Sequence, residues 1–185
     1  YPWHLVGNNG EQIAADFKSI VQQQEKRTKY KICPGVHLLN RKNIFIDAGT
    51  TVKPGVVFDA ENGPIYIGKN ARIFPTAVIE GPAFIGAGTL IKIGAKIYEN
   101  TSIGEMCKVG GEVESSILHS YSNKQHDCFL GHAYLGMWCN LGADTNNSDL
   151  KNNYGTVRVP INGKEVDSGS QFVGLTMGDH SKSGI

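Results

Sequence analysis

An aliphatic residue recurs at every sixth position through the middle of this 185-residue chain. This spacing excludes the two commonest patterns, because an amphipathic α-helix needs a period of about 3.6 residues and a half-buried strand a period of two. The insertion Glu61-Asn62-Gly63-Pro64 shifts the phase once. The unbroken series contains Ile67, Ile73, Ile79, Ile85, Ile91, Ile97, Ile103 and Val109, and the series before the insertion contains Ile46, Val52 and Phe58.

The sequence also has a second, longer repeat period. Ile67, Ile85 and Ile103 are each followed by Gly and lie 18 residues apart. Six residues form one short strand and a turn, and three such units close one triangular coil. The aliphatic residue of each unit then points inward and stacks on its counterpart in the next coil, where each buried Ile contributes about 1.5–3 kcal/mol. The pattern therefore predicts a mainly β fold, a parallel β-helix.

The chain divides into two predicted parts. Residues 1–43 are expected to hold a linker and one amphipathic helix, over about residues 10–27, that acts as a spacer or caps the open end of the β-helix. The opening Tyr1-Pro2-Trp3 is expected to be the tail of an upstream segment. Residues 44–185 are expected to form the β-helix, truncated at its C-terminal end because the repeat still runs there. We therefore expect the chain to be part of a longer protein.

Composition narrows the classes of function. The 18 basic and 17 acidic side chains give a formal net charge of +1, which argues against a nucleic-acid or membrane partner recruited by bulk charge. No apolar run approaches the roughly 18 residues of a membrane span. The four cysteines form no CxxC pair, which favours free thiols and a cytoplasmic location. We expect a small-molecule substrate.

The candidate site is expected between Lys92 and Lys151, where loops interrupt the repeat. His119, His126 and His132 fall within this region. An imidazole with a pKa near 6.5 is suited to take a proton from an attacking amine at neutral pH, so a general base is one interpretation. A zinc site built from several His across a subunit interface is a second, and an exposed His without a catalytic role is a third.

The run His126-Asp127-Cys128-Phe129-Leu130-Gly131 is followed by Asn140-Leu141-Gly142-Ala143-Asp144-Thr145-Asn146-Asn147. These segments resemble the acetyltransferase half of the bifunctional glucosamine-1-phosphate acetyltransferase/N-acetylglucosamine-1-phosphate uridylyltransferases, in the hexapeptide-repeat acyltransferase superfamily. They are similar also to bacterial sugar nucleotidyltransferases related to that enzyme. The resemblance implies a left-handed coil and a homotrimer with clefts at the subunit boundaries. It implies acetyl transfer from acetyl-CoA to an amino-sugar 1-phosphate, as a step toward UDP-N-acetylglucosamine.

The resemblance also implies roles for individual residues. His126 matches the catalytic base, which deprotonates the sugar amine before it attacks the thioester. Substrate binding is expected of Lys92, Phe129, Asn140 and Lys151. Acetyl-CoA contacts are expected of Ala143 and Asn147.

Three departures from the family pattern bear on this assignment. Phe129 replaces a sugar-binding Tyr, Glu114 reverses the charge of an expected Lys, and Asp144 replaces a Gly. Glu114 and Phe129 favour an alternative, in which the domain is a non-catalytic oligomerising part of a sugar-1-phosphate nucleotidyltransferase. A second alternative is a zinc-dependent hydratase of the carbonic-anhydrase type. Mg²⁺ is expected only if an upstream nucleotidyltransferase domain exists.

Overall fold

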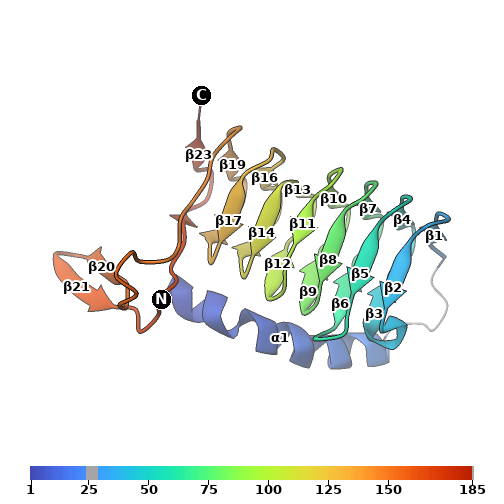
Figure 1. Ribbon diagram of the computed structural model, residues 1–185, viewed down its shortest axis with the longest axis horizontal. Coiled ribbons are helices and arrows are strands. Elements are labelled where there is room, and N and C mark those ends of the chain that lie inside the picture. Colours follow the sequence, from blue (N-terminus) through green and yellow to red (C-terminus); the bar gives the residue numbers. More distant parts are fainter. Residues whose placement is uncertain (24–28, 185) are drawn as a thin grey trace.

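The computed structural model describes residues 1–23 and 29–184, and side chains within helix α1 only as far as Val21. It confirms a mainly β chain whose parallel sheets form a β-solenoid preceded by one helix (Figure 1). In the described residues the three parallel sheets contain eight, six and seven strands.

The eight-stranded sheet, called sheet A, contains β1 (Lys31–Ile32), β4 (Thr51–Val52), β7 (Arg72–Ile73), β10 (Leu90–Ile91), β13 (Lys108–Val109), β16 (Asn123–Lys124), β19 (Asn140–Leu141) and β23 (Lys182–Ser183). The six-stranded sheet B contains β2 (His37–Leu39), β5 (Val57–Asp59), β8 (Val78–Glu80), β11 (Lys96–Ile97), β14 (Glu112–Glu114) and β17 (Phe129–Gly131). The seven-stranded sheet C contains β3 (Ile44–Ile46), β6 (Ile65–Ile67), β9 (Ala83–Ile85), β12 (Thr101–Ile103), β15 (Ile117–Leu118), β18 (Tyr134–Leu135) and β22 (Thr176–Met177).

The six-residue series forms the core. On sheet C, Ile67 pairs with Ile85 and Ile85 with Ile103, so residues 18 apart stack in neighbouring coils. All three are fully buried. Sheet A stacks Ile73, Ile91 and Val109 in the same way. Each coil buries its aliphatic residues only against its neighbours, so the stack is stabilised cooperatively.

The solenoid begins before the predicted boundary at residue 44. β1 pairs in parallel with β4 and β2 with β5, so a first coil starts at Lys31. In this coil Ile32 and Leu38 occupy the columns of Val52 and Phe58. The 3₁₀ turn η1 (Arg41–Asn43) is followed by two buried residues, Ile44 and Ile46, and the predicted series continues from Ile46, out of phase with Ile32 and Leu38. The periodicity therefore does not reveal this coil.

Helix α1 (Pro2–Gln23) also begins earlier than predicted. Pro2 opens it, which suits a residue without an N–H group at the first helical position. Pro2 and Trp3, which are expected to be part of the tail of an upstream segment, belong to this helix, and residues 24–27 of the expected helix lie outside the described residues. The helix does not cap the end of the solenoid. It runs along the outside, against β9, β12 and β18 of sheet C (Figure 1).

Two features anchor α1 to the solenoid. Asn9, almost fully buried, donates from Nδ2 to the carbonyl of Asn100 (2.7 Å) and accepts from the Ser102 hydroxyl (2.8 Å). At Gly10 a Cβ would collide with the Asn100 side chain, so a glycine is needed for this close approach. Searched over the described residues, no helix is long and apolar enough to span a membrane.

A long insertion separates β19 from β22. It carries the antiparallel hairpin β20 (Arg158–Ile161) and β21 (Lys164–Asp167), which projects from the solenoid (Figure 1). Sheet B ends at β17, whereas sheets A and C continue past the insertion to β23 and β22. The insertion therefore replaces the next strand of sheet B.

Candidate functional site

His126 lies in the turn of residues 125–128, which connects β16 of sheet A to β17 of sheet B. Its side chain is exposed, and so is that of Asp127. Among the described residues, the imidazole makes no hydrogen bond or ion pair. The structure thus presents His126 at an outer corner of the solenoid with its ring nitrogens free for an external molecule. This geometry is compatible with a general base.

The two other candidate histidines have partners. His119 Nε2 lies 2.9 Å from the Tyr134 hydroxyl. His132 Nδ1 lies 2.7 Å from Asp149 Oδ2, and its ring stacks on Phe172 with centroids 5.0 Å apart. In the described part of the chain, no three His, Cys, Asp or Glu side chains gather in a way that could hold a metal ion.

Lys92 and Asn140 lie on the sheet A side of the His126 turn. Lys92 directly follows β10, and its Cβ lies near Gly110, which occupies the same place one coil later. Gly110 in turn donates its N–H to the carbonyl of Lys124, two residues before His126. Asn140 lies in β19, one coil further along the chain than the His126 turn, and pairs there with Asn123 of β16. Lys92, His126 and Asn140 are thus placed over four successive coils along the same side of the solenoid.

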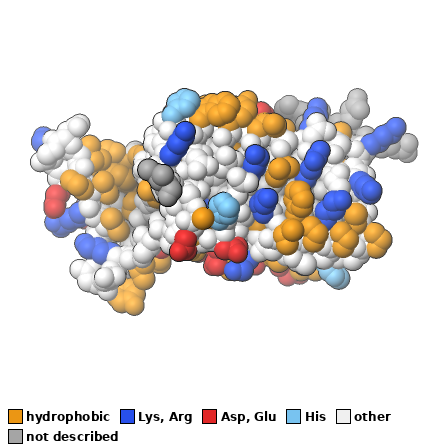
Figure 2. Space-filling view, turned by 90° about the horizontal axis from the view of Figure 1, so that it is seen from above, with side chains coloured by type: hydrophobic (Ala, Val, Ile, Leu, Met, Phe, Trp, Pro, Cys, Tyr) orange, Lys and Arg blue, Asp and Glu red, His pale blue; other side chains and the backbone are white. Residues whose placement is uncertain are grey.

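The outer side of sheet A is basic. None of its eight strands contains Asp or Glu. The acidic side chains Asp59, Glu80, Glu112 and Glu114 lie instead in strands of sheet B. Figure 1 has the labels of sheet A along the top of the molecule, and Figure 2, seen from above, shows Lys and Arg side chains spread among hydrophobic ones. The cations on the outer side of sheet A, in its strands or directly after them, make no ion pair with a described residue. They are Lys31, Lys53, Arg72, Lys92, Lys108 and Lys182.

Phe129 lies on sheet B, opposite Glu112. Its ring packs over Gly131, where a Cβ would lie only 2.5 Å from Phe129 Cζ. Glu114 occupies the other end of the neighbouring strand, opposite Gly131 and away from the His126 turn. Burial raises the pKa of the Glu114 carboxyl, and nearby His132 opposes this shift.

Two of the predicted binding residues are occupied within the chain. Asn147 accepts from the Gly131 N–H (3.1 Å) and donates to the Gly131 carbonyl (2.9 Å). Lys151 Nζ donates to the carbonyl of Thr156 (2.9 Å) inside its own loop. Ala143 is exposed just after β19. The structure thus places Lys92, His126 and Asn140 at different coils along the same side of the solenoid, and it uses the side chains of Asn147 and Lys151 in hydrogen bonds within the chain.

Lys124 was not among the predicted site residues. It is 1% exposed and points into the solenoid, where its Nζ donates to the carbonyls of Gly110 (2.8 Å), His126 (3.1 Å) and Cys128 (2.8 Å). A signal for it exists in the sequence. Lys124 lies six residues after Leu118 and six before Leu130, so it occupies an inward position of the repeat.

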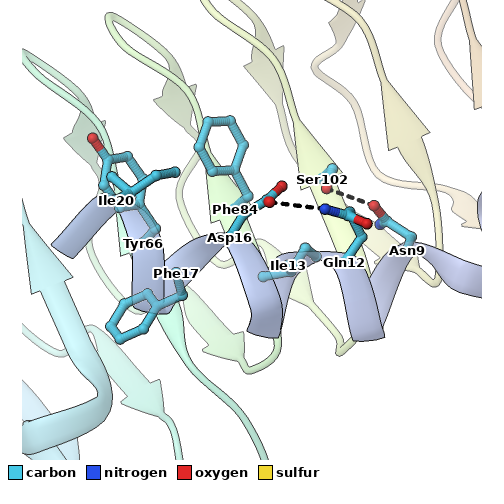
Figure 3. A pocket seen from close by; sticks show the side chains of 9 residues that line it. All are labelled: Asn9, Gln12, Ile13, Asp16, Phe17, Ile20, Tyr66, Phe84 and Ser102. Carbon is cyan, nitrogen blue, oxygen red and sulfur yellow. Dashed lines mark hydrogen bonds between the residues drawn. The ribbon is translucent and has the colours of Figure 1, made fainter. Parts of the chain in front are cut away.

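A separate cavity of about 360 Å³ lies between α1 and sheet C (Figure 3). It is mostly apolar, with Ile13, Phe17 and Ile20 on the helix side and Tyr66 and Phe84 on the sheet side. Tyr66 stacks between Phe45 and Phe84 with ring centroids 5.2 Å apart. This cavity lies away from the His126 turn, on the other side of the solenoid.

Comparison with known proteins adds to this geometry. No family model matches the chain. A protein named bifunctional protein GlmU from Rippkaea orientalis is 26% identical over 191 residues, which is 91% of this chain and 41% of the relative. The protein of the same name from Synechococcus elongatus is 30% identical over 159 residues, 75% of this chain and 34% of the relative. The one from Clostridium kluyveri is 29% identical over 153 residues, 70% of this chain and 30% of the relative.

The chain is thus similar to bifunctional GlmU proteins at 26–30% identity. The likeness covers most of the chain, and the β-solenoid is consistent with the hexapeptide-repeat acetyltransferase part of GlmU. The chain spans 30–41% of the length of these three GlmU proteins. A transferase domain of the GlmU C-terminal type is therefore supported.

Proposed function

We propose that this domain transfers an acetyl group from acetyl-CoA to the amino group of an amino-sugar 1-phosphate, with glucosamine 1-phosphate as the first substrate to test. The main support is the position of His126, which matches the catalytic base of the resembled family and lies exposed at a corner of the solenoid with no partner in the described chain. The similarity to GlmU proteins over most of the chain supports the same reaction class.

In this reaction the sugar amine attacks the carbonyl carbon of the thioester. An imidazole nitrogen of His126 takes the proton that the amine loses as the new N–C bond forms. The C–S bond then breaks, and the His126 imidazolium returns the proton to the departing thiolate, so CoA leaves as a thiol. A neutral imidazole is a suitable base for this step near pH 7.

Lys92 and Asn140 are the proposed substrate-binding residues. An ammonium beside the corner attracts the sugar phosphate, and the Asn140 amide offers both a donor and an acceptor to sugar hydroxyls. Phe129 would contribute its ring instead of a hydroxyl. Ala143 is the proposed backbone contact for acetyl-CoA, whereas Asn147 must first release Gly131, and Lys151 must release Thr156, before they could bind a ligand.

A homotrimer is part of the proposal. An exposed corner cannot enclose a substrate by itself, so a neighbouring subunit is needed for the second wall of a cleft. The parent protein is proposed to work in the cytoplasm, in the synthesis of UDP-N-acetylglucosamine or a similar nucleotide sugar, with Mg²⁺ used only by an upstream nucleotidyltransferase domain.

The test is thiol release by the full-length protein with acetyl-CoA and glucosamine 1-phosphate. We expect His126→Ala to reduce kcat by about 10²–10⁴-fold. His119→Ala is the matched control, because His119 is an exposed imidazole that interacts with Tyr134. If the His126→Ala variant kept wild-type activity, His126 would not be the catalytic base.

A non-catalytic, oligomerising domain is the second candidate. Two observations favour it, namely that Asn147 and Lys151 are used internally and that Phe129 lacks a hydroxyl. Calorimetry with acetyl-CoA separates the two candidates. A trimer that binds no acetyl-CoA, in protein of the full natural length, would favour the structural role.

A further inference from the structure

Lys124 occupies a position that aliphatic residues fill in the neighbouring coils. The inward column of sheet A runs through Ile91, Val109, Lys124 and Leu141. Lys124 is as buried as these residues, and it makes no ion pair with a described residue. A buried ammonium is costly unless its donors are satisfied, so its presence requires a physical reason.

That reason lies in the length of one corner. Residues 92–96 separate inward Ile91 from Ile97, and residues 125–129 separate Lys124 from Leu130. Between these two coils, only residues 110–112 separate Val109 from Val113. The corner between sheets A and B is therefore two residues shorter in the coil beneath the His126 turn.

A corner of normal length supports the next one through its backbone. Thr76 donates its N–H to the Pro54 carbonyl (3.2 Å), and Gly94 donates to the Pro75 carbonyl (3.1 Å). The shortened corner, residues 110–112, lacks the residues whose N–H groups would continue this series of hydrogen bonds to residues 125–128. Without Lys124 the carbonyls of Gly110 and His126 would lack a backbone N–H donor from the described residues inside the solenoid, which is unfavourable, whereas the Cys128 carbonyl also accepts from the Glu112 N–H (3.0 Å).

The Lys124 ammonium supplies the missing donors. Its three N–H groups meet three carbonyls, those of Gly110, His126 and Cys128. Two of these carbonyls belong to the turn that carries the candidate base, and the third belongs to the shortened corner. The fit is close, because a Cβ at Gly111 would lie 2.8 Å from Lys124 Nζ and 2.8 Å from the His126 carbonyl.

We infer that Lys124 is a positioning residue for the acetyl-transfer site, since it holds the backbone of His126 from inside the solenoid and thereby fixes where the exposed imidazole stands. The inference rests on the function proposed above. The His126 side chain makes no hydrogen bond of its own in the described chain, so its place depends on how firmly the 125–128 turn is held.

The test compares Lys124→Met with the wild-type, full-length protein by amide hydrogen exchange and by steady-state kinetics. Met is apolar and of similar length, so it suits the interior but leaves the three carbonyls without the ammonium. We expect exchange of the Gly110 and Glu112 amides, which donate to the carbonyls of Lys124 and Cys128, to become about tenfold faster and kcat to fall about tenfold, with KM for acetyl-CoA within about twofold. Ile73→Met, in the same column but in a coil with corners of normal length, should change neither quantity.

The two measurements separate the inference from the proposed function. If the wild-type protein has no acetyl-transfer activity, the proposed function fails, while the exchange comparison still reports on Lys124. Unchanged exchange in a folded Lys124→Met protein would overturn the inference. If this variant does not fold, the Nζ protons of the wild-type protein decide by NMR. Slow solvent exchange supports the inference, and exchange as fast as that of exposed Lys108 contradicts it.

Discussion

Asn147 takes the place of a strand beside Gly131. Its side-chain amide accepts from the N–H and donates to the carbonyl of Gly131, as the opposite residue in a hydrogen-bonded pair of an antiparallel sheet would. The neighbouring Asn146 accepts from the Phe129 N–H (2.8 Å), and the Asn147 N–H donates to the Phe129 carbonyl (3.1 Å). These bonds close the edge of sheet B, which would otherwise expose unpaired groups to another chain.

Asn147→Ala is therefore expected to destabilise the fold by about 1–3 kcal/mol, because it leaves both Gly131 groups without their partners. Urea unfolding monitored by circular dichroism measures the change. The control is Asn152→Ala, since Asn152 is exposed in the same insertion and its side chain makes no hydrogen bond with the described residues. Equal stability of the two variants would contradict the role of Asn147 at the edge.

The stacked aliphatic residues of the core allow a prediction about the effect of a buried charge. Ile85→Asp places a carboxylate at a fully buried position and is expected to reduce the free energy of unfolding by more than about 4 kcal/mol, enough to prevent folding. Ile93→Asp introduces the same group at a residue that is 68% exposed and should be nearly neutral. Soluble yield and thermal unfolding distinguish the two.

Gly111→Ala tests the packing under the His126 turn. Gly111 has a φ of +67°, and its Cβ would lie 2.8 Å from Lys124 Nζ and from the Cys128 nitrogen. Gly35→Ala is a suitable control, because Gly35 has a φ of +79° but its Cβ would meet only the Gly55 nitrogen, at 3.8 Å. The backbone strain of about 1–2 kcal/mol is common to both. Gly111→Ala should lose about 1–3 kcal/mol more, measured by urea unfolding.

Because of the buried Cys107 thiol, we expect the free energy of unfolding to fall at high pH. Burial raises the pKa of its thiol from 9.0 to about 11. Above pH 9 the thiol ionises in the unfolded chain before it ionises in the folded one, so the folded state becomes less favoured as the pH rises toward 11. The wild-type protein should lose about 2–3 kcal/mol more than Cys107→Val over this interval. Parallel stability curves for the two proteins would contradict this prediction.

The fold could be predicted from the sequence because the stacked Ile residues all point into the core, in every coil. A six-residue step leaves a signal only where every corner has the same length. The first coil was missed because the predicted series starts from Ile46, out of phase with Leu38, and the start of α1 was missed because its first turns carry few of the aliphatic residues that mark an amphipathic helix.

The candidate site was predictable only in part. His126 could be found from the motif around it, since a turn residue matched to a family needs no knowledge of packing. The internal use of Asn147 could not be foreseen, because a loop Asn has the same sequence signal whether it binds a ligand or a strand edge. Lys124 was overlooked because a lysine is normally counted as exposed, although its place in the repeat is inward.

The basic side of sheet A has a consequence that the net charge of +1 conceals. The cations of sheet A lie on one side of the solenoid and the carboxylates of sheet B on another, so the electric field around its long axis is expected to be uneven. Such a field draws phosphorylated molecules toward Lys92 before any contact is made, and it weakens as ions screen it over about 8–10 Å. The rate at which anions reach this surface should therefore fall with added salt, even though the protein as a whole is almost neutral.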